Sequence, residues 1–220
     1  MIPIVVLDRV RAPGGELVLN QRGKQFWIQL AGVELMNSRD HSSEDELARR
    51  AIAKLDDRPR PKVLVGGLGL GFTLRAALDV LPAAARVDVV EIVPAVVRWN
   101  REIFGGLAGH PLSDPRVTVI EGDVGNVIAQ ADRHYDVIVI DVDNGPEGVG
   151  EGNHVLYRRT SLAAMLRALT PGGMLGVWSS FQSPTFTHSL NAVGFVAEAV
   201  RLRSKFSGGP THHLWFARRP

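Results

Sequence analysis

Four glycines fall within six residues directly after an apolar run, a pattern typical of a nucleotide or nucleoside pocket. They are Gly66, Gly67, Gly69 and Gly71, and an apolar, helix-like pattern follows them. Glycine lets the backbone turn sharply and approach a ligand closely where a Cβ would clash. A strand that enters a helix through such a turn points free backbone N–H groups at the ligand. The sequence therefore predicts that these four glycines bind a nucleoside-type cofactor.

Acidic residues follow two other predicted strands of the same region. Glu91 lies about 20 residues beyond the glycines, where an acidic side chain accepts hydrogen bonds from ribose hydroxyls. It could instead stabilise the N-terminus of the helix that begins at Pro94. Asp123, followed by Val124, could cap the next helix or accept from a purine amino group, and a carboxylate has acceptor sites for both. We predict that Glu91, Asp123 and Val124 bind the cofactor.

A third group of polar residues follows the predicted strand 137–140. Asp141 and Asp143 are two residues apart, so continued strand geometry puts both on one side, with Asn144 beside them. Two close carboxyls raise the pKa of one of them, which can then act as a base near neutral pH and attract a cationic amine. An ordinary polar turn is the alternative, and a magnesium site lacks an apparent third ligand. We predict that Asp141, Asp143 and Asn144 are catalytic.

Alternating strand and helix patterns position these residues. The strand segments are near-continuous Val/Ile/Leu runs, which are typical of strands covered on both faces. Predicted strands are 63–65, 87–90, 117–120, 137–140, 174–178 and a closing antiparallel pair, 195–202 and 213–217, with helices at 70–81, 94–104, 124–131, 156–169 and 185–193. This order predicts an α/β fold with a doubly wound, mostly parallel seven-stranded sheet. Ligands of such sheets bind beyond the carboxyl ends of the strands.

The first 40 residues follow a different pattern. Short alternating or β-branched runs at 2–7, 16–19, 25–30 and 33–36, separated by glycine turns, predict a small β subdomain. Ser43 and Glu46 could form a capping box at the start of the first helix. We therefore predict a small N-terminal β subdomain over 1–40 and the α/β domain over 41–220.

The composition is that of an ordinary globular protein. Apolar residues make up 45% and charged residues 22%, and a net charge of +2 is too small to indicate nucleic-acid binding. The absence of cysteine excludes disulfides and thiolate metal sites and fits a cytoplasmic location. The histidines lack metal-ligand spacing, so we expect no metal site. The N-terminus lacks the basic region of a signal peptide, and Gly, Ser and Pro interrupt the uncharged stretch 168–197, so we expect no membrane association.

These residues together resemble the polyamine aminopropyltransferases, the spermidine synthase-like group of the Rossmann-type S-adenosylmethionine-dependent methyltransferase superfamily. The matching segments are 66–71, Glu91, 114–117, 122–123, 135–141, 145–146 and 156–157. The resemblance implies S-adenosylmethionine or its decarboxylated form as cofactor, Glu91 at the ribose, Asp123 at the adenine, and Asp141 as the base that deprotonates an acceptor amine. It also implies a homodimer, for which the open strand edges of the N-terminal segment offer an interface.

The chain departs from the family at several site positions. The family has an aspartate, which pairs with the ammonium of the decarboxylated donor, where this chain has Gly69. Glu44 and Asp45 replace a tyrosine–histidine or tyrosine–glutamine pair. Asn144 replaces the second aspartate of the catalytic loop, and a glutamine expected near Trp178 is absent.

The uncharged position 69 favours intact S-adenosylmethionine. An aspartate there would repel the donor's carboxylate at a cost of about 1 kcal/mol or more, whereas glycine leaves backbone N–H groups free to bind it. The main hypothesis is a methyltransferase acting on a small amine or hydroxyl acceptor, a polyamine among the candidates. Asp141 would be its base, and Asp143 and Asn144 would hold the acceptor. Trp178 and Tyr157 either wall this pocket or belong to the core.

Three alternatives remain open. The chain could be an aminopropyltransferase that uses the decarboxylated donor, or a non-catalytic nucleoside-binding homologue. An NAD-dependent oxidoreductase ranks last, because no residue pattern for hydride acceptance follows the glycine fingerprint.

Overall fold

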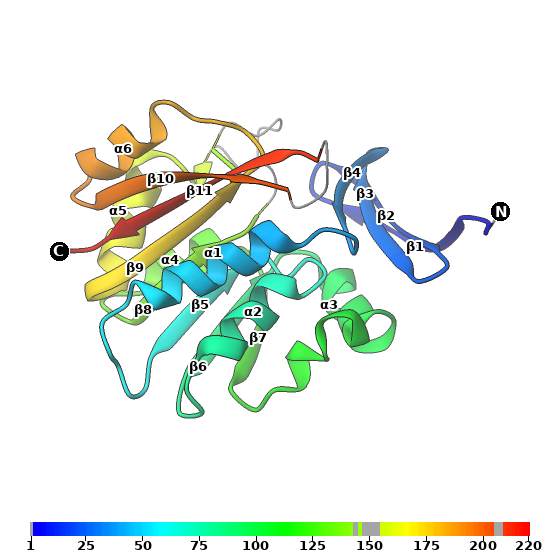
Figure 1. Ribbon diagram of the computed structural model, residues 1–220, viewed down its shortest axis with the longest axis horizontal. Coiled ribbons are helices and arrows are strands. Elements are labelled where there is room, and N and C mark those ends of the chain that lie inside the picture. Colours follow the sequence, from blue (N-terminus) through cyan, green and yellow to red (C-terminus); the bar gives the residue numbers. More distant parts are fainter. Residues whose placement is uncertain (1, 143–144, 147–154, 205–208) are drawn as a thin grey trace.

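The computed structural model describes residues 2–142, 145–146, 155–204 and 209–220. Its strands form two sheets (Figure 1). A four-stranded sheet has the order β1-β2-β3-β4, and a seven-stranded sheet has the order β10-β11-β9-β8-β5-β6-β7. The doubly wound, mostly parallel seven-stranded sheet and the separate small N-terminal sheet confirm the predicted fold class. No helix in the described part of the chain is long and apolar enough to cross a membrane.

The small sheet is an antiparallel meander. Its strands are β1 (Val5–Ala12), β2 (Gly15–Arg22), β3 (Gln25–Leu30) and β4 (Val33–Asn37). The prediction of a first strand at 2–7 was wrong at both ends, because β1 pairs with β2 from Val5 to Ala12. Leu19 and Ile28 are fully buried in the same apolar cluster as the first helices of the large domain. Since this core is continuous between the two sheets, the domain boundary at residue 40 stays a prediction.

The large sheet follows the predicted order of elements. They are β5 (Lys62–Gly66), α2 (Phe72–Val80), β6 (Arg86–Glu91), α3 (Pro94–Glu102), β7 (Val117–Glu121), α4 (Val124–Gln130), β8 (Tyr135–Ile140), α5 (Arg159–Ala168), β9 (Leu169–Ser179), α6 (Phe186–Ala192), β10 (Val196–Arg203) and β11 (Thr211–Arg218), with short 3-10 turns at Gly105–Ala108 and Pro111–Ser113. Strands β5 to β9 pair in parallel, and β11 is antiparallel to both neighbours. Helices α1 to α3 pack in one apolar cluster and α4 to α6 in another, so both faces of the sheet are covered.

Two helix predictions needed correction. Helix α5 begins at Arg159 rather than at residue 156, and β9 already begins at Leu169. The predicted capping box of α1 (Ser42–Ala53) does not form. Asp40 instead accepts hydrogen bonds from the backbone N and the hydroxyl of Ser42, at 3.1 and 2.7 Å. Glu46 pairs with Arg50 at 2.6 Å, so a side chain outside the helix, not the expected pair within it, orders the first turn.

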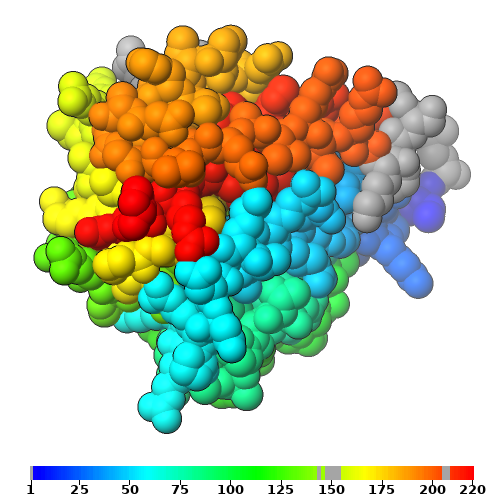
Figure 2. Space-filling view, turned by 60° about the vertical axis from the view of Figure 1, so that its left-hand side comes forward, coloured from blue at the N-terminus to red at the C-terminus, as the bar shows by residue number. Residues whose placement is uncertain are grey.

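The C-terminal strand pair lies beside α1. Figure 2 shows the orange and red strands next to the cyan helix. Lys54, just beyond the helix, pairs with Glu198 of β10 at 2.6 Å, and its carbonyl accepts from Arg218 of β11 at 3.2 Å. These contacts join the start and the end of the large domain. Arg218 pairs with Met174 near the beginning of β9, so the contacts lie on the amino side of the central strands.

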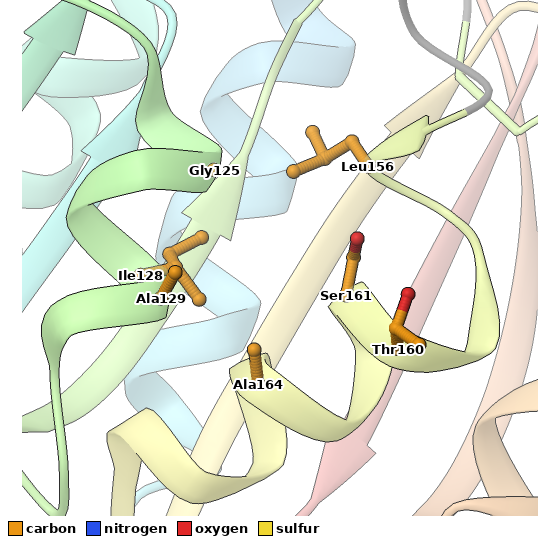
Figure 3. A pocket seen from close by; sticks show the side chains of 7 residues that line it. All are labelled: Gly125, Ile128, Ala129, Leu156, Thr160, Ser161 and Ala164. Carbon is orange, nitrogen blue, oxygen red and sulfur yellow. The ribbon is translucent and has the colours of Figure 1, made fainter.

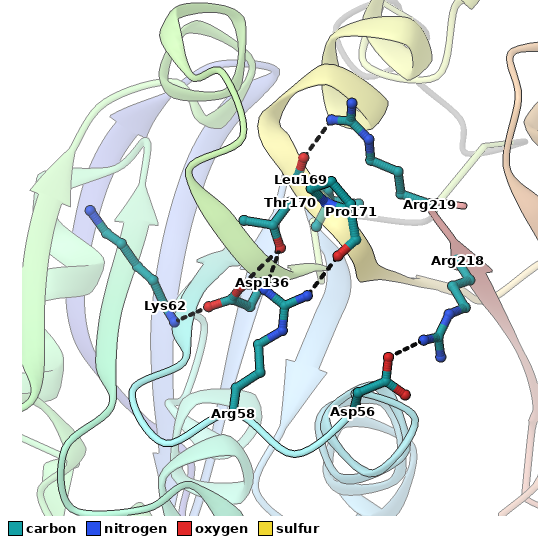
Figure 4. A network of polar contacts seen from close by, with 9 residues as sticks. All are labelled: Asp56, Arg58, Lys62, Asp136, Leu169, Thr170, Pro171, Arg218 and Arg219. Atoms are coloured by element: carbon teal, nitrogen blue, oxygen red, sulfur yellow. Dashed lines mark hydrogen bonds and ion pairs between the residues drawn. The ribbon is translucent and has the colours of Figure 1, made fainter.

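A buried carboxylate joins the amino ends of the central strands. Asp136 of β8 is 8% exposed and accepts from Arg58 at 2.5 Å, the Thr170 hydroxyl at 2.8 Å and the Lys62 backbone N at 2.8 Å. Arg58 also donates to the carbonyl of Pro171 at 2.6 Å, as Figure 4 shows. Because a buried charge is tolerated only when it is well paired, this network fixes β5, β8 and β9 relative to one another and so sets where their other ends lie.

Candidate active site

The glycine loop makes close contact with the neighbouring strand ends. Gly67 has φ +90°, and a Cβ there would overlap the carbonyl oxygen of Asp141. Gly71 has φ +87°, and a Cβ there would lie 2.9 Å from the side-chain oxygen of Asn100. A Cβ at Gly66 would lie 2.8 Å from Val124. The loop therefore needs glycine at these positions for packing, and its backbone lies directly beside the end of β8.

Glu91 organises the glycine loop. It ends β6, is 8% exposed, and accepts from the backbone N of Leu68 at 3.1 Å and of Val93 at 2.9 Å. Each bond uses a different carboxylate oxygen. The expected helix-terminus role is thus present through Val93, and the other bond ties Glu91 to the glycine loop through Leu68.

Asp123 caps α4. Its Oδ1 accepts from the backbone N of Gly125 at 2.6 Å and of Asn126 at 3.2 Å. The other oxygen, Oδ2, lies at the same strand edge and could accept from a purine amino group. Ile92, which directly follows Glu91, is half exposed although it is apolar. An exposed apolar side chain next to Glu91 at the strand ends suits the flat face of a base.

A pocket of about 220 Å³ lies between α4 and α5. Figure 3 shows Ile128 and Ala129 on one helix facing Ser161 and Ala164 on the other, with Leu156 at the end nearest the start of α4. Gly125, one of the residues that Asp123 caps, also lines this pocket. The pocket therefore adjoins the adenine position that the sequence predicts, away from the carboxyl groups described next.

Asp141 directly follows β8 and is partly buried. Burial raises the pKa of Asp141 to about 6, although a hydrogen bond from the Thr73 hydroxyl to Oδ2 acts in the opposite direction. Thr73 is the second residue of α2 and is 2% exposed. The hydroxyl therefore holds one carboxylate oxygen and leaves Oδ1 to receive a proton.

Glu44, in the first turn of α1, carries a second carboxyl of this region. Burial and the negative charge of Asp141 raise the pKa of Glu44 to about 7, while the Ser43 hydroxyl donates to it at 2.5 Å. Asp40 lies close by. Burial raises its pKa, but hydrogen bonds from Ser204 and Ser42 outweigh this effect and keep the pKa below its ordinary value. Three acids therefore face one region beyond the carboxyl ends of the central strands.

The other two predicted catalytic residues, Asp143 and Asn144, lie outside the described residues. The chain is described again at Gly145, which has φ +80°, and a Cβ there would overlap the side chain of Ser179 at the end of β9. Gly145 therefore lies directly against the end of the neighbouring strand. Among the described residues, no group of three or more acidic or histidine side chains could hold a metal ion.

Comparison with known proteins decides the family. Residues 50–194 match the spermine/spermidine synthase domain. The chain belongs to this family. Putrescine N-methyltransferase 3 of Nicotiana tabacum is 39% identical over 119 residues, which are 53% of this chain and 30% of that protein. The polyamine aminopropyltransferase of Bacillus subtilis (strain 168) is 30% identical over 162 residues, which are 73% of this chain and 55% of that protein.

The matched region thus spans less than a third of the tobacco protein and about half of the Bacillus protein. The crystal structure of spermidine synthase from Thermotoga maritima superposes with a TM-score of 0.78 at 17% identity, covering 98% of this chain and 73% of that chain. This likeness confirms the fold. Both kinds of transferase, methyl and aminopropyl, occur among the relatives of this spermidine synthase-like chain.

Gly69 is the point where this family member differs most plainly from the expected family pattern. It has φ +50°, and a Cβ there would lie 2.9 Å from the sulfur of Met36, which belongs to β4 of the small sheet. Asn100 donates to the Gly69 carbonyl at 2.8 Å. A side chain at position 69 would therefore meet an apolar side chain from the small sheet.

Of the two aromatic residues considered for the pocket wall, Tyr157 belongs to the core. It is 9% exposed and meets the ring of Phe186 edge-on, with centroids 5.6 Å apart. Trp178 is partly exposed at the end of β9, and its ring lies 5.1 Å from that of His212. Its buried Nε1 has no hydrogen-bond partner in the described part of the chain. Since His212 also acts electrostatically on Asp40, Trp178 borders the region of the three acids.

The sequence analysis missed Thr73, Met36 and the role of Glu44. The signal for Thr73 was its place two residues after the last glycine, in the helix turn that faces the strand ends. Glu44 was noted only as a departure from the family. Its approach to Asp141 depends on how α1 packs on α2 and β8, which no local pattern encodes.

Proposed function

We propose that this protein binds S-adenosylmethionine and transfers its methyl group to a small amine or hydroxyl acceptor, with Asp141 as the base. The environment of Gly69 supports this donor. No carboxylate is present at position 69, and the neighbouring Met36 sulfur leaves little room for one. The tobacco relative's name supports methyl transfer and a polyamine as acceptor.

The donor would lie along the glycine loop and the strand ends beside it. Gly66, Gly67, Gly69 and Gly71 would line the donor. The backbone N–H groups of Gly67 and Gly71 already donate to the carbonyls of Val90 and Leu68, at 2.9 and 2.8 Å. We therefore assign the donor's carboxylate to the N–H of Gly69, because such groups before a helix start favour anions. The ribose hydroxyls would donate to Glu91. The adenine would lie between Ile92 and the region of Val124, with its amino group donating to Asp123.

Asp141 would take a proton from the acceptor. The acceptor's N–H bond breaks, its proton goes to Asp141 Oδ1, and the freed lone pair forms the bond to the methyl carbon as the carbon–sulfur bond breaks and its electrons go to sulfur. An alkylammonium has a pKa of about 10.4. The raised pKa of Asp141, about 6 instead of 3.8, makes this proton transfer less costly by roughly 3 kcal/mol than transfer to an exposed aspartate.

Aminopropyl transfer from the decarboxylated donor is the second candidate. The Bacillus aminopropyltransferase supports it, because that match covers 73% of this chain. The acids at the strand ends would attract a polycation in either reaction.

Calorimetric titration with S-adenosylmethionine and, in parallel, with its decarboxylated form tests the proposal. We expect tighter binding of the intact donor, followed by transfer of labelled methyl to putrescine. Tighter binding of the decarboxylated form, with 5′-methylthioadenosine as product, would establish the second candidate. Binding without any product would indicate a non-catalytic homologue.

We also propose how the acceptor is bound and how the protein assembles. Asp143 and Asn144 would hold the acceptor, and the protein would act as a cytoplasmic homodimer without nucleic acid. The edge strand β1 and the residues before it supply an apolar surface, with Ile4, Val5 and Val6 exposed by 55, 49 and 44%. Gel filtration at several concentrations tests the dimer.

A further inference from the structure

A second, polar cavity lies on the small N-terminal sheet and has a volume of about 140 Å³. Trp27 of β3 and Asn37 of β4 are directly opposite each other in the sheet, and both line this cavity. Their chain neighbours face the other way, since Ile28 is fully buried in the main core and Met36 lies beside the glycine loop. Because successive side chains of a strand alternate between its faces, the cavity lies on the face of the small sheet that is turned away from the glycine loop.

The side chains that line this cavity include several hydrogen-bond donors without partners. Arg22, at the end of β2, and Arg39, just beyond β4, both line it. Within the described residues, neither guanidinium has an ion-pair or hydrogen-bond partner, and the same holds for the indole N–H of Trp27 and the side-chain amide of Gln25, which also line the cavity. All four side chains are donors, and of the four only the amide of Gln25 can also accept.

The acceptor side chains of the lining are engaged with their own neighbours. Glu34 is the one acid among the described residues that line the cavity, and its Oε1 accepts from the Asn37 amide at 2.9 Å. The Oδ1 of Asn37 accepts from the backbone N of Arg39 and of Asp40, at 2.9 and 3.4 Å. Two arginines and one glutamate leave the lining net positive. Free donors in a net positive cavity favour an anion with several oxygens.

We propose that this cavity binds a small oxyanion, a phosphate or carboxylate group, through Arg22 and Arg39. A guanidinium presents paired N–H groups whose spacing matches two oxygens of such a group, and Trp27 and Gln25 would add further donors. The volume of about 140 Å³ is room for about four to five water molecules, which suits a single oxyanion and is too small for a nucleotide. The cavity is separate from the proposed donor site, so this inference goes beyond the proposed function and does not rest on it.

The first test follows the indole N–H signals of the ligand-free protein by proton–nitrogen NMR. Sodium phosphate is titrated in at constant ionic strength, with sodium chloride making up the difference. The Trp27 signal, identified by its loss in Trp27→Phe, should shift saturably with a Kd of about 1 mM or tighter, the range that a few charge-assisted hydrogen bonds reach. Trp99 and Trp215 serve as internal references, because they are no more than 1% exposed. A Trp27 signal that does not shift saturably with phosphate or with acetate would overturn the proposal.

A parallel titration with sodium acetate distinguishes the two sources of such a group. Saturation by phosphate alone assigns a phosphate ligand, and saturation by acetate alone assigns a carboxylate. Saturation by both assigns an oxyanion site that does not discriminate between them. No S-adenosylmethionine is present in either titration, so the outcome does not depend on the proposed function.

Substitutions of single arginines identify the binding groups. Arg22→Gln and Arg39→Gln should each weaken the binding of phosphate or acetate at least about tenfold, because each removes a charge-assisted hydrogen bond. Arg9→Gln is the matched control. It removes the same charge from the same sheet, but Arg9 is paired with Glu16 at 2.7 Å, so binding should be unchanged. Equal losses in all three variants, or no loss in any of them, would overturn the site.

The charge of Glu34 gives a test of the opposite sign. Glu34→Gln keeps an oxygen that can accept from Asn37 and removes the negative charge of the lining. The same titrations should then show severalfold tighter binding of phosphate or acetate, because the repulsion between two negative charges is gone. Unchanged or weaker binding would show that a negative charge does not oppose the ligand and would overturn the assignment of an oxyanion.

Discussion

The hydrogen bond from Thr73 to Asp141 should set the pH at which the enzyme becomes active. Thr73→Val keeps the shape of the side chain and removes only the hydroxyl that donates to Oδ2. A hydrogen bond to a charged group contributes about 1.5–3 kcal/mol, which corresponds to a pKa change of about one to two. The pKa of Asp141 should therefore rise from about 6 to roughly 7.5.

The expected loss of activity can be worked out from this change. At pH 7 the ionised fraction of Asp141 falls from about 0.9 to about 0.25, so kcat/KM should drop roughly fourfold and recover above pH 9. The assay is the pH profile of methyl transfer, with Thr73→Ser as the control that keeps the hydroxyl. If Thr73→Val has the profile of the unaltered enzyme, then Thr73 does not tune Asp141 or Asp141 is not the base.

Three further substitutions test other parts of the site. Gly69→Asp should weaken S-adenosylmethionine binding at least about tenfold by charge repulsion and by its contact with Met36; unchanged calorimetric affinity would contradict the donor assignment. The raised pKa of Asp141 lowers the free energy of unfolding as pH rises from about 4 to 6, because the unfolded chain ionises there first. Asparagine does not titrate, so the free energy of unfolding of Asp141→Asn, measured with denaturant, should rise by up to about 3 kcal/mol relative to the unaltered protein between pH 4 and 7. A gap that stays constant with pH would show that the pKa is not raised. Gly67→Ala should lower the free energy of unfolding by more than about 3 kcal/mol, because its Cβ overlaps the Asp141 carbonyl. The control Gly32→Ala, with φ +84° and open space around it, should lower it only by the backbone strain of about 1–2 kcal/mol. Equal losses of stability would refute the packing argument.

Much of the large domain could be predicted from local sequence. The Val/Ile/Leu runs locate β5, β6, β7 and β8 to within about two residues, because strands buried on both faces need continuous apolar sequence. Boundaries set by long-range pairing were less accurate. Strand β1 extends to Ala12 because β2 pairs with it there, and α1 begins where Asp40 accepts from Ser42.

The sequence by itself determined the row of site residues at the strand ends. Gly67 directly follows β5, Glu91 ends β6 and Asp123 comes two residues after β7. In a parallel sheet such residues must meet at one edge. Only the tertiary structure decided what surrounds them. Met36 reaches the glycine loop from another sheet, and Glu44 meets Asp141 because two helices and a strand pack together. Such approaches depend on packing between segments far apart in the chain, which periodicity and spacing do not encode.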